Sequence, residues 1–258
     1  MHLWLDPNFW SRHFVEVFAA QLNAFVDAIE RRVLPGFDSI DREAREAAQR
    51  EYERLGRMPA NDSFDMADAA EQAVDAGIAL YQALWGVRQA LLNLSAAALY
   101  HLFEQQLLLF HRRQVLHPSN QNDLSQVSFE ALKLALAAVG VHVNSLPSWP
   151  IIEELRLLAN AVKHGEGISA AKLRGVRPQF FTDPSIASTL PTIGLPKSIN
   201  MPLAGQDIYV TRADLARYSR ALTNFWIDLA AAITPHADQA QAAQQLDGAD
   251  PPISKTDA

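Results

Sequence analysis

Cysteine is absent from the 258 residues of this chain, which excludes disulfides and thiolate metal sites. No stretch approaches the roughly 18 uncharged apolar residues that a membrane span requires. The first residues do not form a basic start followed by an apolar run, so no secretory signal is expected. The phosphate-binding loops Gly-x-x-x-x-Gly-Lys-Ser/Thr and Gly-x-Gly-x-x-Gly are missing, and so is the Gly-x-Ser-x-Gly nucleophile motif. These absences predict a cytoplasmic protein with no membrane association.

The chain also has fewer basic than acidic residues. The net charge is −7, which argues weakly against broad nucleic-acid binding, while 49% hydrophobic and 20% charged residues are globular values. Much of the acid lies in residues 38–75. After residue 162 the balance reverses, because four basic residues are opposed locally only by Glu166. This local basic patch is either a phosphate-facing surface or a scatter of solubilising charges, and it consists of Lys163, Lys172, Arg174 and Arg177.

Apolar residues recur at three-and-four spacing along most of the chain, which predicts helices. Either Ser63 or Asp65 caps a very long helix that runs to His111 or beyond, and glycines 77 and 86 within it mark a bend or a close helix contact. Ser128 caps a short helix, and Thr211 with Asp214 forms a capping box for a final helix that ends at residue 233. The predicted fold class is all-α: a helical bundle with a long central helix and a Pro-rich irregular excursion.

The Pro-rich excursion covers residues 168–206, where five prolines prevent any helix longer than a turn or two. Residues 207–210 follow it as a candidate short strand. The predicted organisation is N-terminal helices over 1–60, which are a separate subdomain or part of the same bundle, and a helical bundle over 61–234. Residues 235–258, rich in Ala, Gln, Asp and Pro, are expected to be disordered.

One predicted helix carries a group of side chains suited to phosphate chemistry. At about 100° per residue, Arg156, Asn160, Lys163 and His164 fall within roughly a 100° arc, and the aliphatic residues fall on the opposite side. A guanidinium, an amide, an ammonium and an imidazole can together bind a phosphate, polarise a P–O bond and move a proton. The other interpretation is a solvated polar face on an ordinary amphipathic helix.

The same helix resembles the signature helix of HEPN domains. The resemblance rests on Leu155-Arg156, Asn160 and Lys163-His164-Gly165. It extends upstream to residues 99–104 and downstream to residues 177–181 and 202–211, so that it covers roughly residues 64–234. HEPN domains are compact helical bundles of bacterial toxins and defence proteins, and many are metal-independent ribonucleases. The resemblance therefore implies an HEPN-like bundle over residues 61–234.

The resemblance also implies roles for the four side chains. His164 would act as acid or base on the 2′-hydroxyl or leaving oxygen, Arg156 and Lys163 would neutralise phosphate charge, and Asn160 would orient the phosphate or His164. No metal or cofactor is expected. The implied partners are RNA, a second copy in a homodimer whose signature helices face each other, and a cognate regulatory protein of a toxin–antitoxin or phage-defence system.

One residue departs from the family pattern. In nuclease members an Arg precedes the His with four to six residues between, often directly before an Asn, whereas this chain carries Ala159 there, so Arg156 is the nearest upstream guanidinium. This departure favours the alternative function, a non-catalytic helical module that binds a partner protein, a nucleotide or RNA. In that alternative, Asn160 and His164 satisfy buried polar partners.

Two His/Glu pairs are candidates for metal ligands. His13 with Glu16 and His101 with Glu104 are each three residues apart on a predicted helix. Their order is the reverse of the Glu-x-x-His motif of bundle metal sites, and no third or fourth ligand accompanies them. Polar groups in or beside the core are the preferred interpretation.

Overall fold

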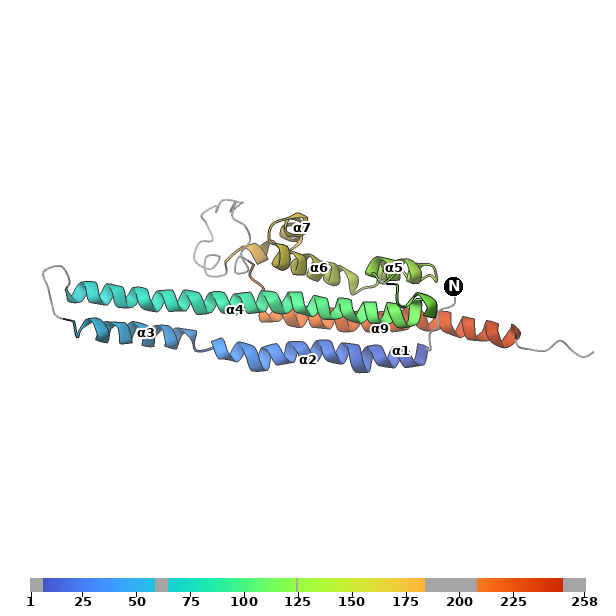
Figure 1. Ribbon diagram of the computed structural model, residues 1–258, viewed down its shortest axis with the longest axis horizontal. Coiled ribbons are helices and arrows are strands. Elements are labelled where there is room, and N and C mark those ends of the chain that lie inside the picture. Colours follow the sequence, from blue (N-terminus) through green and yellow to red (C-terminus); the bar gives the residue numbers. More distant parts are fainter. Residues whose placement is uncertain (1–6, 59–64, 124, 184–207, 248–258) are drawn as a thin grey trace, which may run out of the picture. The chain divides into compact units, whose positions relative to one another are not determined.

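The computed structural model describes residues 7–58, 65–123, 125–183 and 208–247, with side chains placed from residue 9 and up to residue 233 (Figure 1). Helices make up nearly all of these ranges, and no strand occurs within them, so the all-α prediction is confirmed. The main helices are α1 (Pro7–His13), α2 (Ala20–Ala28), α3 (Ile40–Leu55), α4 (Met66–Phe110), α5 (Phe129–Ala137), α6 (Trp149–His164), α7 (Ile168–Val176) and α9 (Arg212–Asp247).

Shorter helical turns connect several of these helices. Two π-helical segments, η1 (Phe14–Ala19) and η2 (Ile29–Val33), continue α1 and α2, and another, η4 (His111–Val115), continues α4. The 3₁₀ turns are η3 (Leu34–Phe37), η5 (Pro118–Asn120), η6 (Val143–Ser145) and η7 (Pro178–Phe181). The long central helix therefore runs to His111 and beyond, as predicted.

Local capping chemistry sets the helix starts. The Asp65 carboxylate accepts from the N–H groups of Ala67 and Asp68 at 2.7 and 3.0 Å, and Asp65 N–H donates back to Asp68. Of the two predicted caps of α4, Ser63 lies outside the described residues. The Ser128 hydroxyl accepts from Ala131 N–H at 3.1 Å and starts α5. Such caps satisfy N–H groups that have no partner within the helix.

The chain folds into two compact units, each built from segments that are separated in the sequence. The first contains residues 1–24, 99–153 and 218–258, and the second contains residues 25–98 and 154–217. Along the N-terminal helices the chain passes from one unit to the other after residue 24. The predicted N-terminal region of residues 1–60 stays a prediction. An HEPN-like bundle over residues 61–234 stays a prediction.

The core of the first unit is aromatic. Trp226 of α9 lies 4.7 Å from Phe14 and 5.7 Å from Phe103, measured between ring centroids, and all three side chains are buried. The indole N–H of Trp226 donates to Gln106, whose amide group in turn donates to the Phe18 carbonyl. Buried rings supply much of the stabilising area, and this hydrogen-bonded pair satisfies the polar atoms enclosed among them.

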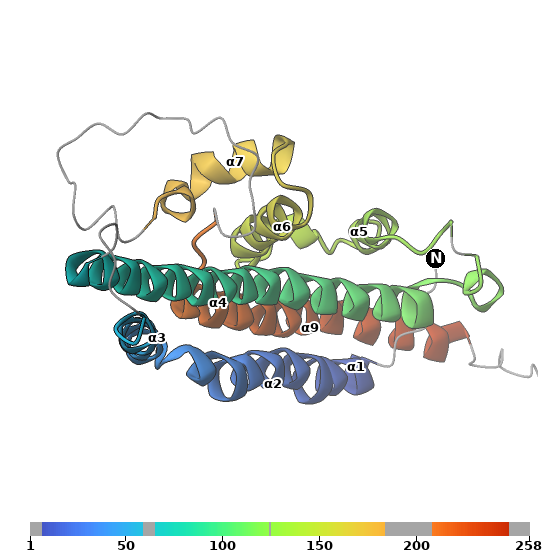
Figure 2. The ribbon, with the colours of Figure 1, turned by 60° about the vertical axis from the view of Figure 1, so that its left-hand side comes forward.

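In the second unit, α3 lies beside the N-terminal half of α4, as Figures 1 and 2 both show. The contact is close because Gly77 has no side chain. A Cβ at residue 77 would lie 2.9 Å from the Ala44 carbonyl oxygen and 3.0 Å from the Ala48 Cβ. The prediction of a close helix contact is therefore confirmed at Gly77.

The predicted strand at residues 207–210 is wrong for its described part, because residues 208–210 pair with side chains rather than with a second strand. Gln89 and Asn93 of α4 donate to the carbonyls of Val210 and Ile208 at 3.0 and 2.7 Å. Tyr209 N–H donates to the Phe180 carbonyl at 2.9 Å. These bonds hold the segment on α4 with no β-ladder.

The final helix starts as predicted and ends later. Thr211 N–H donates to the Asp214 carboxylate, and Asp214 N–H donates to the Thr211 hydroxyl, at 3.0 and 3.2 Å, which is a capping box. Helix α9 continues past Ile233 to Asp247, so the disorder predicted from Pro235 is corrected for residues 235–247, where Ala and Gln favour helix. Residues 248–258 and the greater part of the Pro-rich excursion, 184–207, lie outside the described residues.

Candidate functional site

The four predicted site residues all lie on α6, so their helical spacing is confirmed. Exposure increases toward the C-terminal end of the helix. Arg156 and Asn160 are half-buried, whereas Lys163 and His164 are exposed. The opposite face is packed, since Leu155 and Leu158 are fully buried. One helix therefore presents the polar group and anchors it to the core.

The C-terminal end of α6 is closed by a glycine. Gly165 has φ 72°, a left-handed conformation in which glycine carries no steric penalty, and its N–H donates to the Ala161 carbonyl at 2.9 Å. The helix therefore stops directly after His164. Lys163 and His164 lie in its last turn, where the helix dipole stabilises a positive charge.

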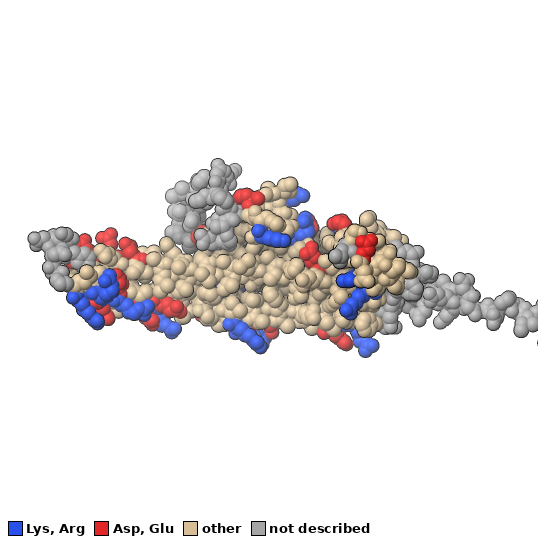
Figure 3. All heavy atoms as spheres, in the orientation of Figure 1, with Lys and Arg blue, Asp and Glu red and all other residues tan. Residues whose placement is uncertain are grey.

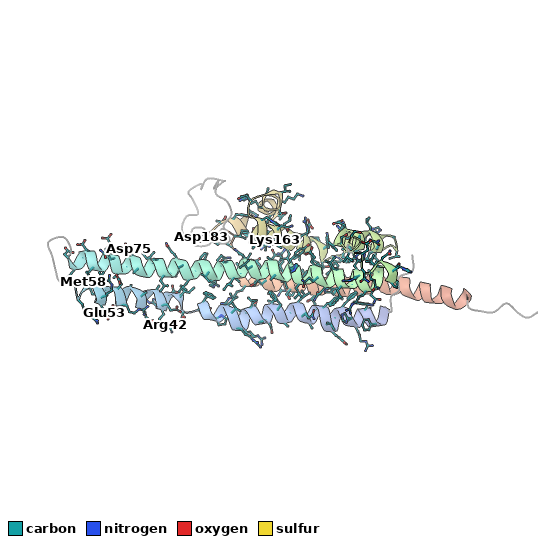
Figure 4. All side chains as sticks on the ribbon, in the orientation of Figure 1. Arg42, Glu53, Met58, Asp75, Lys163 and Asp183 are labelled. Atoms are coloured by element: carbon teal, nitrogen blue, oxygen red, sulfur yellow. The ribbon has the colours of Figure 1, made fainter. Side chains whose placement is uncertain are left out.

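Three of the four side chains have no partner in the described structure. Those of Asn160, Lys163 and His164 make no hydrogen bond or ion pair there, and Figure 4 places Lys163 on the α6 segment of the second unit. Arg156 does engage another group. The C-terminal end of α6 thus offers an amide, an ammonium and an imidazole to a ligand.

The Ala159 position is closed to an arginine-like role. Ala159 is only 6% exposed, so it belongs to the packed side of α6 rather than to the polar face. Arg156, one turn before Asn160 on nearly the same face, is the one guanidinium that α6 itself carries.

Nearer the N-terminal end of α6, a network of ion pairs that the sequence did not predict connects the helix to other segments of the second unit. Arg217 of α9 donates two hydrogen bonds to the Glu154 carboxylate, at 2.7 and 2.8 Å. Arg177 bonds Asp214 at 2.5 Å, and its Nε lies 3.6 Å from Glu154. The Glu154 side chain is 11% exposed. Two guanidinium groups thus meet two carboxylates within the second unit, which balances their charge.

This network changes the interpretation of the basic patch. Arg177 is mostly buried in the network and lies over the Phe180 ring, with 4.6 Å from its guanidinium carbon to the ring centroid. Arg174 is paired with Glu166. Within the described part of the chain, only Lys163 and Lys172 of the four basic residues have no carboxylate partner. Figure 3 shows one face of the molecule, with Lys and Arg side chains in blue and Asp and Glu side chains in red.

The Glu166–Arg174 pair is exposed. The hydrogen bond from Arg174 lowers the pKa of the Glu166 carboxyl below its usual range. Glu166 is therefore ion-paired with Arg174 and does not serve as a partner for Lys163.

The two His/Glu pairs lie apart from any metal-binding geometry. The His101 Nδ1 lies 3.7 Å from the Glu104 carboxylate on the surface of α4, and the His13 ring packs edge-on against Trp10 and Phe18. Among the described residues, no group of three or more His, Asp or Glu side chains is placed to hold an ion.

No helix of the described residues is both long and apolar enough to cross a membrane.

Comparison with known proteins adds no family: no protein-family model, no curated protein and no solved structure matches the chain. The site therefore rests on its own geometry.

Proposed function

We propose that the chain is an HEPN-like, metal-independent endoribonuclease of a toxin or defence system, with its site at the C-terminal end of α6. The observation that supports this most strongly is the contrast in pairing along α6. The mostly buried Glu154 is engaged by arginines, whereas Lys163 and His164 are exposed and without partners in the described structure. An unpaired ammonium group beside an imidazole is suited to a phosphodiester.

The proposed reaction uses the RNA as its own nucleophile. The 2′-oxygen attacks the adjacent phosphorus, the bond from phosphorus to the 5′-oxygen breaks, and a 2′,3′-cyclic phosphate and a free 5′-hydroxyl result. His164 takes the proton from the 2′-hydroxyl or gives one to the leaving 5′-oxygen. Lys163 and Arg156 offset the charge that develops on the phosphoryl oxygens, and Asn160 orients the phosphate.

A homodimer is part of the proposal. HEPN nucleases commonly build their site from two facing signature helices, and the last turn of α6 carries exposed side chains that suit such an arrangement. Two copies of Lys163 and Arg156 would repel each other unless an anion lay between them. RNA or phosphate should therefore stabilise the dimer.

The test is cleavage of a mixed RNA pool with and without EDTA, by the wild-type protein and by His164→Ala. The proposal predicts cleavage that survives EDTA, leaves 2′,3′-cyclic phosphate ends and disappears in the variant. His142→Ala is the matched control, because His142 is also exposed and its side chain makes no hydrogen bond in the described structure. Equal loss of cleavage in both variants would contradict a special role for His164.

A second candidate function follows from Ala159. Because this position is buried and lacks the guanidinium of the nuclease pattern, the same surface could serve a non-catalytic module that binds RNA, a nucleotide or a partner protein. The two functions differ in one result. Wild-type protein that binds RNA through Lys163 and His164 but releases no cyclic phosphate ends supports the module.

A further inference from the structure

A cavity of about 830 Å³ lies between α3 and α4 in the second unit, away from the residues of the proposed nuclease site. Its volume falls within the range of small-molecule sites, which is about 300 to 1,000 Å³. Asp183 and Tyr209, which follow η7 and precede α9 in the chain, complete its lining.

The cavity follows from the residue sizes on the two helices. The α3 wall includes the small residues Ala44 and Ala48, four positions apart, and Gly77 lets the helices approach there. Small side chains on α3 cannot cover the larger ones on α4. Val74 and Ile78 are therefore 55% and 49% exposed and form an apolar wall.

Three aromatic residues line the cavity. Tyr81 and Trp85 are four residues apart on α4 and so share one face of the helix. Tyr209 comes from the segment that Gln89 and Asn93 hold against α4, and its ring lies 5.8 Å from that of Trp85 at 46°. The inclined rings of Trp85 and Tyr209 thus form one aromatic wall, and Tyr81 also lines the cavity.

The charged residues that line the cavity favour a cationic ligand over an anionic one. Two carboxylates, Asp41 and Asp183, accompany one guanidinium, Arg45, and no lysine of the described residues lines the cavity. Asp183 lies beside one of the rings, since the Tyr209 hydroxyl donates to its carboxylate at 3.4 Å. A phosphate-bearing ligand would meet this negative excess with a single basic group. A cation gains from both the carboxylates and the faces of the rings.

We propose that this cavity binds a small organic cation, with its ammonium group among Trp85, Tyr209 and Asp183 and its apolar body along Val74 and Ile78. Recognition of quaternary ammonium groups by aromatic cages follows the same physics. The proposal does not depend on the ribonuclease, because none of the lining residues lies on α6.

The test is calorimetric titration of the whole chain with choline and with 3,3-dimethylbutan-1-ol, which has the same shape without the charge. Choline should bind, and the alcohol should bind at least several-fold more weakly. Trp85→Leu should weaken choline binding about 5- to 30-fold, the range expected for loss of a cation–π contact of about 1 to 2 kcal/mol. Asp183→Asn should also weaken choline binding.

Asp75→Asn is the matched control, because it removes the same charge from an exposed residue of α4 that does not line the cavity (Figure 4). Choline affinity should be unchanged in this variant. Absence of choline binding, equal affinity for the alcohol, or an equal effect of Asp75→Asn and Asp183→Asn would overturn the proposal. Should Trp85→Leu fail to fold by circular dichroism, Asp183→Asn still decides, because it keeps the shape of the side chain.

Discussion

The two ends of α6 show how one helix divides its charged residues between stability and binding. Near its start, Glu154 is almost buried and bonded to Arg217, with Arg177 close by. At its end, Lys163 and His164 are exposed and have no partner in the described structure. A buried, paired charge is needed by the fold because its removal leaves the partners uncompensated. An exposed, unpaired charge contributes little to stability and is free to meet a ligand.

The largest effect is expected from breaking the buried end. Glu154→Gln leaves Arg217 and Arg177 facing each other with one carboxylate fewer, and the free energy of unfolding should fall by about 3 to 5 kcal/mol. Urea unfolding followed by circular dichroism measures this loss. Glu166→Gln is the control, because it breaks an exposed pair with Arg174 and should cost less than about 1 kcal/mol. Similar losses in the two variants would remove the distinction between the network and the surface.

A second contrast compares two glycines of the second unit. Gly77→Ala should destabilise the protein by about 1 to 2 kcal/mol, because its Cβ would meet the Ala44 backbone and this clash outweighs the gain in helix propensity. Gly175→Ala in α7 should be neutral or stabilising by up to about 1 kcal/mol, because a Cβ there would have nothing within 4 Å. Urea midpoints of the two variants test this, and a stabilising Gly77→Ala would contradict the close approach of α3 and α4.

Buried histidines differ from exposed His164 in a further way, because they should make the stability of the protein depend on pH. His111 is 1% exposed, its Nδ1 has no hydrogen-bond partner in the described structure, and burial lowers its pKa below the ordinary 6.5. The unfolded state then binds more protons, so stability is fully present above pH 6.5 and falls as the pH drops below it. His111→Leu should flatten this dependence between about pH 7 and about pH 5 in urea unfolding.

His13 acts in the same direction, because burial and nearby Arg113 lower its pKa, so part of the dependence should persist in His111→Leu. An unchanged slope in His111→Leu would mean that protonation of His111 is not linked to unfolding.

The smallest effects on stability are expected at the exposed end of α6. Lys163→Ala and His164→Ala should each change the free energy of unfolding by less than about 0.5 kcal/mol, because neither side chain has a partner to lose in the described structure. Lys163→Ala should nevertheless weaken RNA binding and reduce its salt dependence by about one ion. Fluorescence anisotropy of a labelled RNA across a salt series measures both quantities, and an unchanged slope would place Lys163 away from the phosphates.

The structural features that depend on residues close together in the chain were predicted from the sequence. The Asp65 and Thr211–Asp214 caps, the length of α4 and the polar face of α6 all follow from contacts within a few positions. The charge network did not, because Glu154 and Arg217 are 63 positions apart and their pairing depends on how α6 and α9 pack. The same reason explains the basic patch: local counting left Arg177 unopposed, whereas its partners come from other helices.

The cavity could not be predicted from the sequence for a related reason. The small residues of α3 and the close approach at Gly77 are visible in the sequence, but the aromatic wall also needs Tyr209, which reaches Trp85 through hydrogen bonds to Gln89 and Asn93. The sequence predicts a short strand over residues 207–210, and that interpretation does not reveal the contact of the Tyr209 ring with Trp85 of α4.

The most direct test of the central claim is an NMR titration of the histidine ring signals with a short RNA in the presence of EDTA. The exposed imidazole of His164, assigned with His164→Ala, should shift on addition of RNA, while that of buried His111 should stay in place. A His164 signal that does not respond, or that moves no more than the His111 signal, would contradict the claim that the end of α6 faces a phosphate.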